Sequence, residues 1–377
     1  MTARIVAIGT AVPPTRIDQT RVRDFFAAQP GADRLTQRRI RAVFDAAAIE
    51  NRHTVLTQLA DPAAIPADRS EDVEGVDFVD EAAVLLAPTT GARNDTYQRL
   101  APDLYASAAS AAMTDAGIPA SAVTHVVTVS CTGFFAPGPD YRLVRDLGLS
   151  DTVQRYHLGF IGCAAAMPAL RLAAQITAAE PDAVVLVVSA ELCTLHVRDS
   201  PDPQQIVAAS VFADGAAAAV ITADPAIGTP GGLDLDRFGT ALTTDGEEDM
   251  VWTIGDRGFE MILSAEVPRI VGREIRGAVD RFLDGSPPPD AWAVHPGGRS
   301  ILDRVEAGLE LDPDALSTSR TVLRDYGNMS SATIMFILRA LLHDDALADG
   351  ARVAALAFGP GLTVESALLT KRSPAVA

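Results

Sequence analysis

The chain is organised around the run GFIGCAAAMPALR, residues 159–171, in which one cysteine follows a glycine-containing turn. The preceding residues 153–158 favour a short strand, and the alanine-rich run after Cys163 favours a helix with one apolar face. Unpaired N–H groups at a helix N-terminus stabilise a thiolate, so we expect the Cys163 pKa to lie below about 8.5. Gly162 and Ala164 leave room for an acyl group, which suits a covalent nucleophile. The alternative is a buried structural cysteine, the more common fate of a single cysteine.

Two later stretches place an imidazole and an amide at the ends of short predicted elements. The run WAVHPGG, residues 292–298, favours a short strand that ends at His295 and is followed by chain-breaking residues. The run DYGNMSSAT, residues 325–333, is a glycine turn that carries Asn328 towards an apolar helix. In thioester chemistry the cysteine sulfur attacks the thioester and histidine stabilises the thiolate. Histidine and asparagine then bind the enolate oxygen formed when a malonyl group loses carbon dioxide. The sequence therefore predicts a catalytic triad of cysteine, histidine and asparagine.

Three further motifs follow one another in a recognisable order. They are VHPGG at residues 294–298, GNMSSA at residues 327–332 and AFGPGLT at residues 357–363. Together with the cysteine stretch they resemble the type III polyketide synthases, the chalcone and stilbene synthase superfamily. The resemblance is collinear and covers almost the whole chain, although Ala357 stands where that family usually has glycine. It implies that the predicted triad is the catalytic site.

The finer pattern of motifs is similar to bacterial members of this superfamily. The runs SCTGF at 130–134, ELC at 191–193 and GFEM at 258–261 resemble actinobacterial sequences. Those relatives include tetrahydroxynaphthalene synthases and alkylpyrone or alkylresorcinol synthases. The chain is therefore identified as a member of the bacterial type III polyketide synthases.

The resemblance implies a homodimeric acyltransferase that needs no cofactor besides its coenzyme A thioester substrates. Acyl-CoA would load Cys163, and malonyl-CoA would extend the chain by decarboxylative Claisen steps. We expect release of a cyclised alkylpyrone or alkylresorcinol. The alternatives are a malonyl-CoA-primed tetrahydroxynaphthalene synthase, a β-ketoacyl-acyl-carrier-protein synthase III and a catalytically silent paralogue that binds acyl-CoA. The run HPGG, residues 295–298, argues against the synthase III, which usually has glutamine, alanine and asparagine after its histidine.

The resemblance also assigns eight positions to the wall of the substrate cavity. Phe212 matches a gatekeeping aromatic between the coenzyme A tunnel and the cavity, and Met261 replaces a second gatekeeping phenylalanine of plant members. Ala136 replaces a methionine that in plant members reaches into the partner subunit's cavity, whereas Trp252 adds bulk. Small or pliable walls near the dimer interface favour a linear apolar chain, so medium- to long-chain fatty acyl-CoA starters are expected. The remaining wall positions are Cys131, Cys193, His196 and Ser330.

Charge and composition limit the partners of the chain. The net charge of −18 argues against nucleic-acid binding, and it means that coenzyme A needs a local basic patch. Arg39, on a predicted helix at 37–48, matches one of the cations with which related enzymes bind the nucleotide phosphates. The three cysteines have no metal-ligand spacing, so no metal site is expected, and their odd number suits a reducing cytoplasm. No apolar run reaches the roughly 18–20 residues of a membrane span.

Buried apolar strands alternate with helical patterns, which predicts an α/β protein. The resemblance implies a thiolase-like fold of two similar halves, with mostly buried central sheets in layers with helices. A run rich in proline, glycine and threonine at 224–232 marks the boundary between residues 1–223, which carry the cysteine, and residues 224–377, which carry the histidine and asparagine. Surface loops with a short helix are expected at 61–91, and a frayed tail at 371–377.

Overall fold

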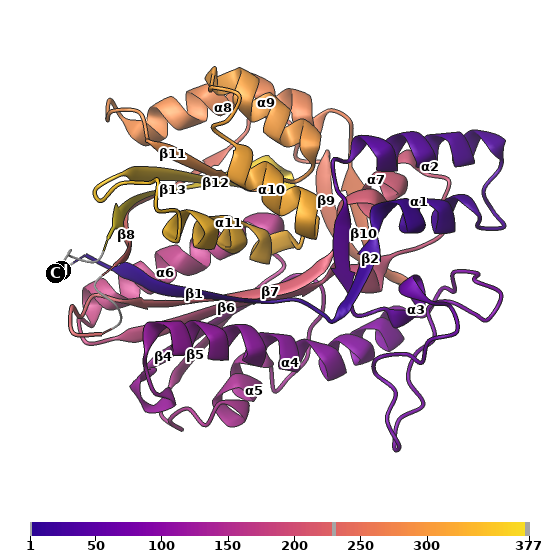
Figure 1. The fold of residues 1–377 in the computed structure, drawn as a ribbon, viewed down its shortest axis with the longest axis horizontal. Helices are drawn as coiled ribbons and strands as arrows, with labels where there is room; N and C mark the ends of the chain where they lie inside the picture. The colour runs from indigo at the N-terminus through magenta and orange to yellow at the C-terminus, as the bar shows by residue number, and fades with distance from the viewer. Residues whose placement is uncertain (1, 228–230, 374–377) are drawn as a thin grey trace.

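A nine-stranded mixed sheet runs through the computed structural model, which describes residues 2–227 and 231–373 (Figure 1). From edge to edge the strands are β5 (Gln154–Gly159), β4 (His125–Ser130), β6 (Val184–Leu192), β7 (Asp214–Thr222), β1 (Arg4–Ala11), β8 (Gly232–Leu242), β13 (Thr363–Arg372), β12 (Arg352–Gly359) and β11 (Ala291–Val294). Strands β1 and β8 join through two residue pairs, Arg4 with Asp234 and Ile5 with Leu233. Each half of the sequence therefore contributes one contiguous block of strands.

Eleven α-helices in the described ranges cover these strands. They are α1 (Gln19–Ala27), α2 (Arg34–Ala46), α3 (Thr57–Ala60), α4 (Thr90–Ala116), α5 (Pro139–Asp146), α6 (Ala166–Ala179), α7 (Pro203–Val211), α8 (Val267–Leu283), α9 (Arg299–Leu309), α10 (Ser317–Tyr326) and α11 (Thr333–Leu342). Two two-stranded antiparallel sheets lie outside the large sheet: β2 (Thr15–Asp18) pairs with β3 (Asn51–Thr54), and β9 (Met250–Gly255) forms a hairpin with β10 (Gly258–Leu263). Within the part of the chain described, no helix is both long and apolar enough to cross a membrane.

Successive side chains of a strand point to opposite faces of the sheet, which divides the core into layers. In β12, Val353, Ala355 and Ala357 pack with α6 and α11, whereas Ala354, Leu356 and Phe358 pack with α8 and α9. Figure 1 shows the resulting order from bottom to top: α4 and α5, the N-terminal strands, α6 and α11, the C-terminal strands, then α8 and α9. Strands with helices on both faces are buried on both faces, and all nine residues of β6 and of β7 are buried, Glu191 and Asp214 included.

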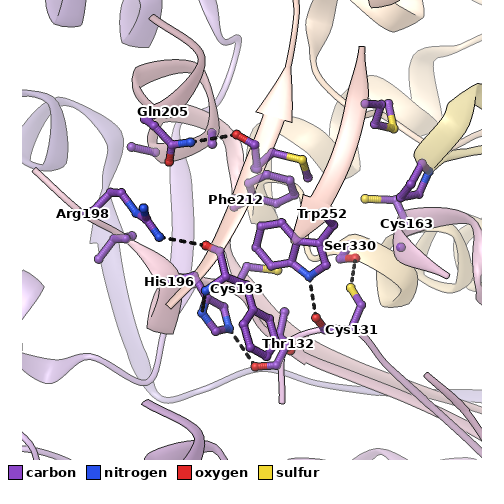
Figure 2. Close-up of a pocket in the computed structure, with 18 residues that line it drawn as sticks. Cys131, Thr132, Cys163, Cys193, His196, Arg198, Gln205, Phe212, Trp252 and Ser330 are labelled. Atoms are coloured by element: carbon purple, nitrogen blue, oxygen red, sulfur yellow. Dashed lines mark hydrogen bonds between the residues drawn. The ribbon is translucent and has the colours of Figure 1, made fainter. Parts of the chain in front are cut away.

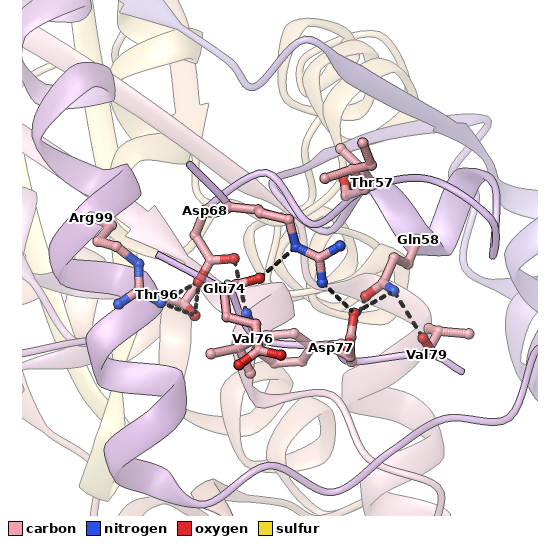
Figure 3. Close-up of polar contacts among 12 residues, drawn as sticks. Thr57, Gln58, Asp68, Glu74, Val76, Asp77, Val79, Thr96 and Arg99 are labelled. Carbon is pink, nitrogen blue, oxygen red and sulfur yellow. Dashed lines mark hydrogen bonds and ion pairs between the residues drawn. The ribbon is translucent and has the colours of Figure 1, made fainter. Parts of the chain in front are cut away.

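The segment before α4 differs from the sequence expectation. We expected a short helix within 61–91, but no helix lies between the end of α3 at Ala60 and the start of α4 at Thr90. Figure 3 shows how the segment is held: the buried carboxylate of Asp68 accepts hydrogen bonds from Val76 N (3.1 Å), Thr96 Oγ1 (2.7 Å) and Arg99. Polar anchoring to α4 replaces the local hydrogen bonds that a helix would supply.

The structure describes only part of the predicted boundary run and of the predicted C-terminal tail. The predicted boundary run includes residues 228–230, which lie outside the described residues, as do residues 374–377 of the predicted tail. Lys371 and Arg372, by contrast, continue strand β13, and Lys371 is buried, with its Nζ donating to the Leu341 carbonyl oxygen (3.3 Å). The chain is therefore ordered further towards its end than its composition suggests.

Candidate active site

Cys163 lies on a tight elbow between strand β5 and helix α6. A single 3-10 turn, Gly162–Ala164, follows the strand, and α6 begins at Ala166. Gly162 has a φ of 75°, and a Cβ there would lie 2.4 Å from the side chain of Pro360. Only glycine fits this backbone conformation and this close approach. The cysteine is thus held at the start of the helix, as the sequence predicted.

His295 and Asn328 reach the same cavity from two other elements. His295 follows β11, its backbone N–H donates to Leu356 O (2.8 Å), and its buried ring nitrogens have no hydrogen-bond partner among the described residues. Asn328 follows α10, where its backbone forms a parallel bridge with Phe212. The cavity, of about 620 Å³, is lined by Cys163, His295 and Asn328 together.

The amide of Asn328 is oriented by its neighbours. Its Oδ1 accepts a hydrogen bond from the backbone N–H of Ser330 at 2.9 Å, whereas Nδ2 makes a long contact of 3.4 Å with Gly297 O. Because Oδ1 is engaged, the amide presents Nδ2 to the cavity, where it hydrogen-bonds the Cys163 sulfur and can donate to a substrate oxygen. The unpartnered ring nitrogens of His295 provide a second donor position.

Burial opposes charge at both ends of the predicted thiolate–imidazolium pair. Burial raises the pKa of Cys163 to about 11, although hydrogen bonds from Ser330 and Asn328 act in the opposite direction. Burial likewise lowers the pKa of His295 to about 3. Burial therefore acts against the expected Cys163 pKa below 8.5, because loss of solvation is the largest influence on the thiol. A thiolate can form by proton transfer to His295, which leaves the pair with no net charge.

Alkylation tests this resting state. Cys163 should react with iodoacetamide before Cys131 and Cys193, which are more deeply buried and whose pKa values burial raises well above the usual range. Below about pH 11 the labelling rate of Cys163 should rise about tenfold per pH unit, with the thiolate fraction. Peptide mass spectrometry on timed samples measures both. A rate independent of pH would contradict a neutral resting thiol, and simultaneous labelling of all three cysteines would contradict the burial order.

A second, inner chamber of about 50 Å³ adjoins the main cavity. Cys163, Phe212, Met250 and Met261 line both spaces, so they form the boundary between them. The inner chamber contains all the residues predicted for the cavity wall except Ala136: Phe212, Met261, Trp252, Cys131, Cys193, His196 and Ser330 (Figure 2). Ala136 lines neither space.

His196 and Trp252 form a rigid side of the inner chamber. The His196 ring stacks on Phe259 at 4.2 Å, its Nδ1 accepts from Phe259 N (3.0 Å), and its Nε2 donates to Thr132 O (2.8 Å). Trp252 Nε1 donates to the carbonyl oxygen of Cys131 at 2.7 Å. Burial lowers the pKa of His196 to about 3, so both ring nitrogens are committed in the neutral form. These contacts suit a wall residue rather than a base.

Two buried charged residues beside the site were not predicted as functional. Glu191, fully buried, accepts hydrogen bonds from the backbone N–H of Cys131 (3.0 Å) and from the hydroxyls of Thr132 (2.8 Å) and Ser331. Arg52 Nη1 donates to the carbonyl oxygen of Phe212 at 2.7 Å. The sequence signal that could have identified them is a charged residue within an apolar stretch. Such a residue is buried only if other residues supply hydrogen bonds or ion pairs to it. Both residues hold the loops that carry the cavity wall.

The comparisons with known proteins show the family of this chain. Residues 1–225 match the N-terminal domain of the chalcone and stilbene synthases, and residues 240–373 match their C-terminal domain. Because the two matches cover well over half of the chain, the protein belongs to the chalcone and stilbene synthase family. It is accordingly a type III polyketide synthase and a transferase.

Relatives and solved structures are similar over the full length of the chain. Bisdemethoxycurcumin synthase from rice (Oryza sativa subsp. japonica) is 34% identical over 388 residues, 97% of this chain and 92% of the rice protein. Probable polyketide synthase 1 from Dictyostelium discoideum is 30% identical over 374 residues, 97% of this chain, and the chain spans only 11% of that protein.

Two crystal structures resemble the fold closely. The C-terminal type III polyketide synthase domain of Steely1, a type I/III hybrid from Dictyostelium, has a TM-score of 0.89 at 29% identity and covers 99% of this chain and 100% of that one. PKS-I from the brown alga Ectocarpus siliculosus also has a TM-score of 0.89, at 28% identity and 98% coverage of both chains. The predicted thiolase-like fold is confirmed.

Proposed function

We propose that this polyketide synthase carries its acyl intermediate on Cys163. The thiol transfers its proton to His295 and attacks the carbonyl carbon of an acyl-CoA thioester. A carbon–sulfur bond to Cys163 forms, the bond to coenzyme A breaks, and the departing sulfur takes the proton from His295. The observation that carries this proposal is that the thiol and the imidazole line one cavity, and that neither ring nitrogen of His295 has a hydrogen-bond partner among the described residues.

Malonyl-CoA would then enter the same cavity. Loss of carbon dioxide leaves an enolate whose oxygen accepts hydrogen bonds from His295 and from Asn328 Nδ2. The enolate carbon attacks the thioester on Cys163, a carbon–carbon bond forms, and the cysteine sulfur leaves. The product is a β-ketoacyl-CoA that can load the cysteine again. As proposed, the steps use Cys163, His295, Asn328 and the coenzyme A thioesters, and they require no cofactor.

Coenzyme A would reach the site through the main cavity. Arg269, Arg299 and Arg304 line it, and the N-termini of α8 and α9, which have no side-chain cap, open onto it. Helix N-termini and arginines attract phosphate groups, which offsets the net charge of −18. Arg39 lines neither space, and its Nη1 donates to Pro201 O (3.3 Å).

The arginines can be tested by separating phosphate recognition from chemistry. Arg304→Gln should raise the KM for malonyl-CoA about tenfold, because one charged contact to phosphate is lost. The same variant should not change kcat/KM for malonyl-N-acetylcysteamine, a thioester without phosphates. Arg39→Gln is the matched control and should have a smaller effect on the KM for malonyl-CoA. A larger effect of Arg39→Gln than of Arg304→Gln would show that the phosphates bind at Arg39, as the family resemblance implies, and not at the arginines of the main cavity.

We propose medium- to long-chain fatty acyl-CoA as starter, with an alkylpyrone or alkylresorcinol as product. The apolar wall of the inner chamber, which includes Phe212, Met261 and Trp252, supports this choice. The chamber volume of about 50 Å³ favours the second candidate, a malonyl-CoA-primed tetrahydroxynaphthalene synthase, because that enzyme starts from a short unit. Incubation with a panel of acyl-CoA starters and malonyl-CoA, analysed by mass spectrometry, separates the two. Faster turnover of malonyl-CoA alone than of any fatty mixture would reject the fatty starter.

The remaining alternatives are supported less well. A synthase III would usually carry a different sequence after its histidine than Pro296 to Gly298. A silent paralogue would bind acyl-CoA without loading Cys163, which stopped-flow measurement of acyl transfer detects. We also propose a homodimer of the bacterial subgroup in the cytoplasm. The exposed outer edge of β5, next to the loop of Ala136, supports the dimer, and the three free cysteines support a reducing compartment.

A further inference from the structure

One wall of the inner chamber is held in an unusual way. Strand β10 pairs with β9 on one edge only, and its other edge faces side chains rather than a strand. There the N–H of Phe259 donates to His196 Nδ1 (3.0 Å) and its carbonyl accepts from Arg198 Nη2 (3.2 Å). Further along, Met261 O accepts from Gln205 Nε2 (2.8 Å). Side chains from η3 (Cys193–His196), from the segment after it and from α7 thus replace the backbone ladder of a neighbouring strand.

These contacts lie at the end of the chamber remote from the nucleophile. Figure 2 shows Arg198 and Gln205 on one side of the chamber and Cys163 on the other, with Phe212 and Trp252 between them. Arg198 also pairs with Glu260 (Nη1 to Oε1, 3.0 Å). Side-chain contacts therefore set the distance between β10 and α7. This distance in turn sets the depth of the chamber.

The chamber is too small in this conformation for the proposed starter. A buried water molecule needs roughly 10–15 Å³ of cavity volume. The inner chamber, with about 50 Å³, therefore accommodates about four water molecules. A long acyl chain attached to Cys163 would require the wall to move. The contacts that would break are well placed for this, because Arg198 is partly exposed and Glu260 is half exposed, so water can replace them.

We propose that Arg198 and Gln205 are specificity-determining residues that set how long an apolar acyl chain the inner chamber accepts. Gln205 holds strand β10 close to α7, and Arg198 holds it close to the segment after η3, around short acyl groups. Both release the strand when a longer chain on Cys163 presses against Phe259 and Met261. This inference rests on the proposed loading of Cys163. It concerns the capacity of the chamber and not the chemistry of loading.

The test compares starters of different length in one double variant, Arg198→Ala with Gln205→Ala. The measured quantity is the ratio of kcat/KM for dodecanoyl-CoA to that for acetyl-CoA. We expect this ratio to rise by about tenfold, the effect of burying roughly two more methylene groups. Arg276→Ala is the matched control, because Arg276 also donates to a carbonyl, Gly308 O (3.0 Å), and pairs with a carboxylate, Glu310 (3.0 Å), but lies on α8 away from the chamber. A ratio that moves no more than in this control would overturn the proposal.

Hydrogen exchange in the wild-type protein gives a second measurement that does not depend on the stability of the variant. The amides of Phe259 and Leu263 are bonded to side chains, His196 and Gln204, so they should exchange faster after dodecanoyl loading than after acetyl loading. Equal exchange in the two loaded forms would show that the wall does not move and would also overturn the proposal. Absence of any acyl group on Cys163 would instead reject the proposed function, so the two failures are distinguishable.

Discussion

Replacing Cys163 with alanine is expected to abolish acyl loading and to lower polyketide formation by about a thousandfold or more, because the acyl chain then has no covalent attachment. The same variant should still decarboxylate malonyl-CoA, since His295 and Asn328 remain in the cavity. This retained reaction is an internal control for folding and for substrate binding. Product formation is measured by mass spectrometry, and decarboxylation by release of labelled carbon dioxide. Polyketide formation at the wild-type rate would reject Cys163 as the nucleophile.

The second large effect concerns the enolate oxygen. Loss of a preorganised donor typically costs about 2.7–4 kcal/mol of barrier, so Asn328→Ala should slow malonyl-CoA decarboxylation by a factor on the order of a hundred to a thousand. Acyl loading should be reduced less, because the thiol and imidazole are intact. His295→Ala should impair both reactions, since the thiol then loses its proton acceptor.

A matched variant separates the donor role of Asn328 from its structural role. Asn328→Asp keeps an acceptor for the backbone N–H of Ser330, which Oδ1 now binds at 2.9 Å, but removes the Nδ2 donor. It should therefore lose decarboxylation as Asn328→Ala does. Decarboxylation at the wild-type rate in either variant would show that this amide does not bind the enolate oxygen.

The strands of the large sheet could be predicted because burial on both faces leaves a simple signal. The strand predicted to end at His295 is β11, whose last residue is Val294, since an apolar run is followed there by chain-breaking residues. The hairpin of β9 and β10 and the helix α10 were not predicted. The hairpin is held to the rest of the protein by side chains distant in sequence, and α10 is largely polar, with only Ser319, Val322 and Leu323 buried. Neither contains a long apolar run, although the buried positions of α10 are spaced i, i+3 and i+4 as in a helix with one apolar face.

Residue types at the ends of predicted elements allowed the candidate site to be proposed from the sequence. Properties that depend on the assembled cavity could not be predicted. Cys163, His295 and Asn328 could be proposed together because a loop after a strand or before a helix carries a side chain towards a common space. The direction of the Cys163 pKa shift depends on burial in the assembled cavity, and the opposing hydrogen bond from Ser330 comes from a segment more than a hundred residues away, so the sequence cannot supply either. Arg304 likewise lines the cavity only after the two halves pack.

The central claim is that an acyl group carried by Cys163 is the intermediate that malonyl-CoA extends. The most direct test loads the protein with acyl-CoA, removes free substrate, adds isotopically labelled malonyl-CoA and follows intact protein and products by rapid-quench mass spectrometry. The account predicts a mass increase located on the peptide containing Cys163, which decays at the rate at which products containing both the starter and labelled two-carbon units are formed. An unmodified Cys163 throughout turnover, or an adduct that persists while product accumulates, would contradict it.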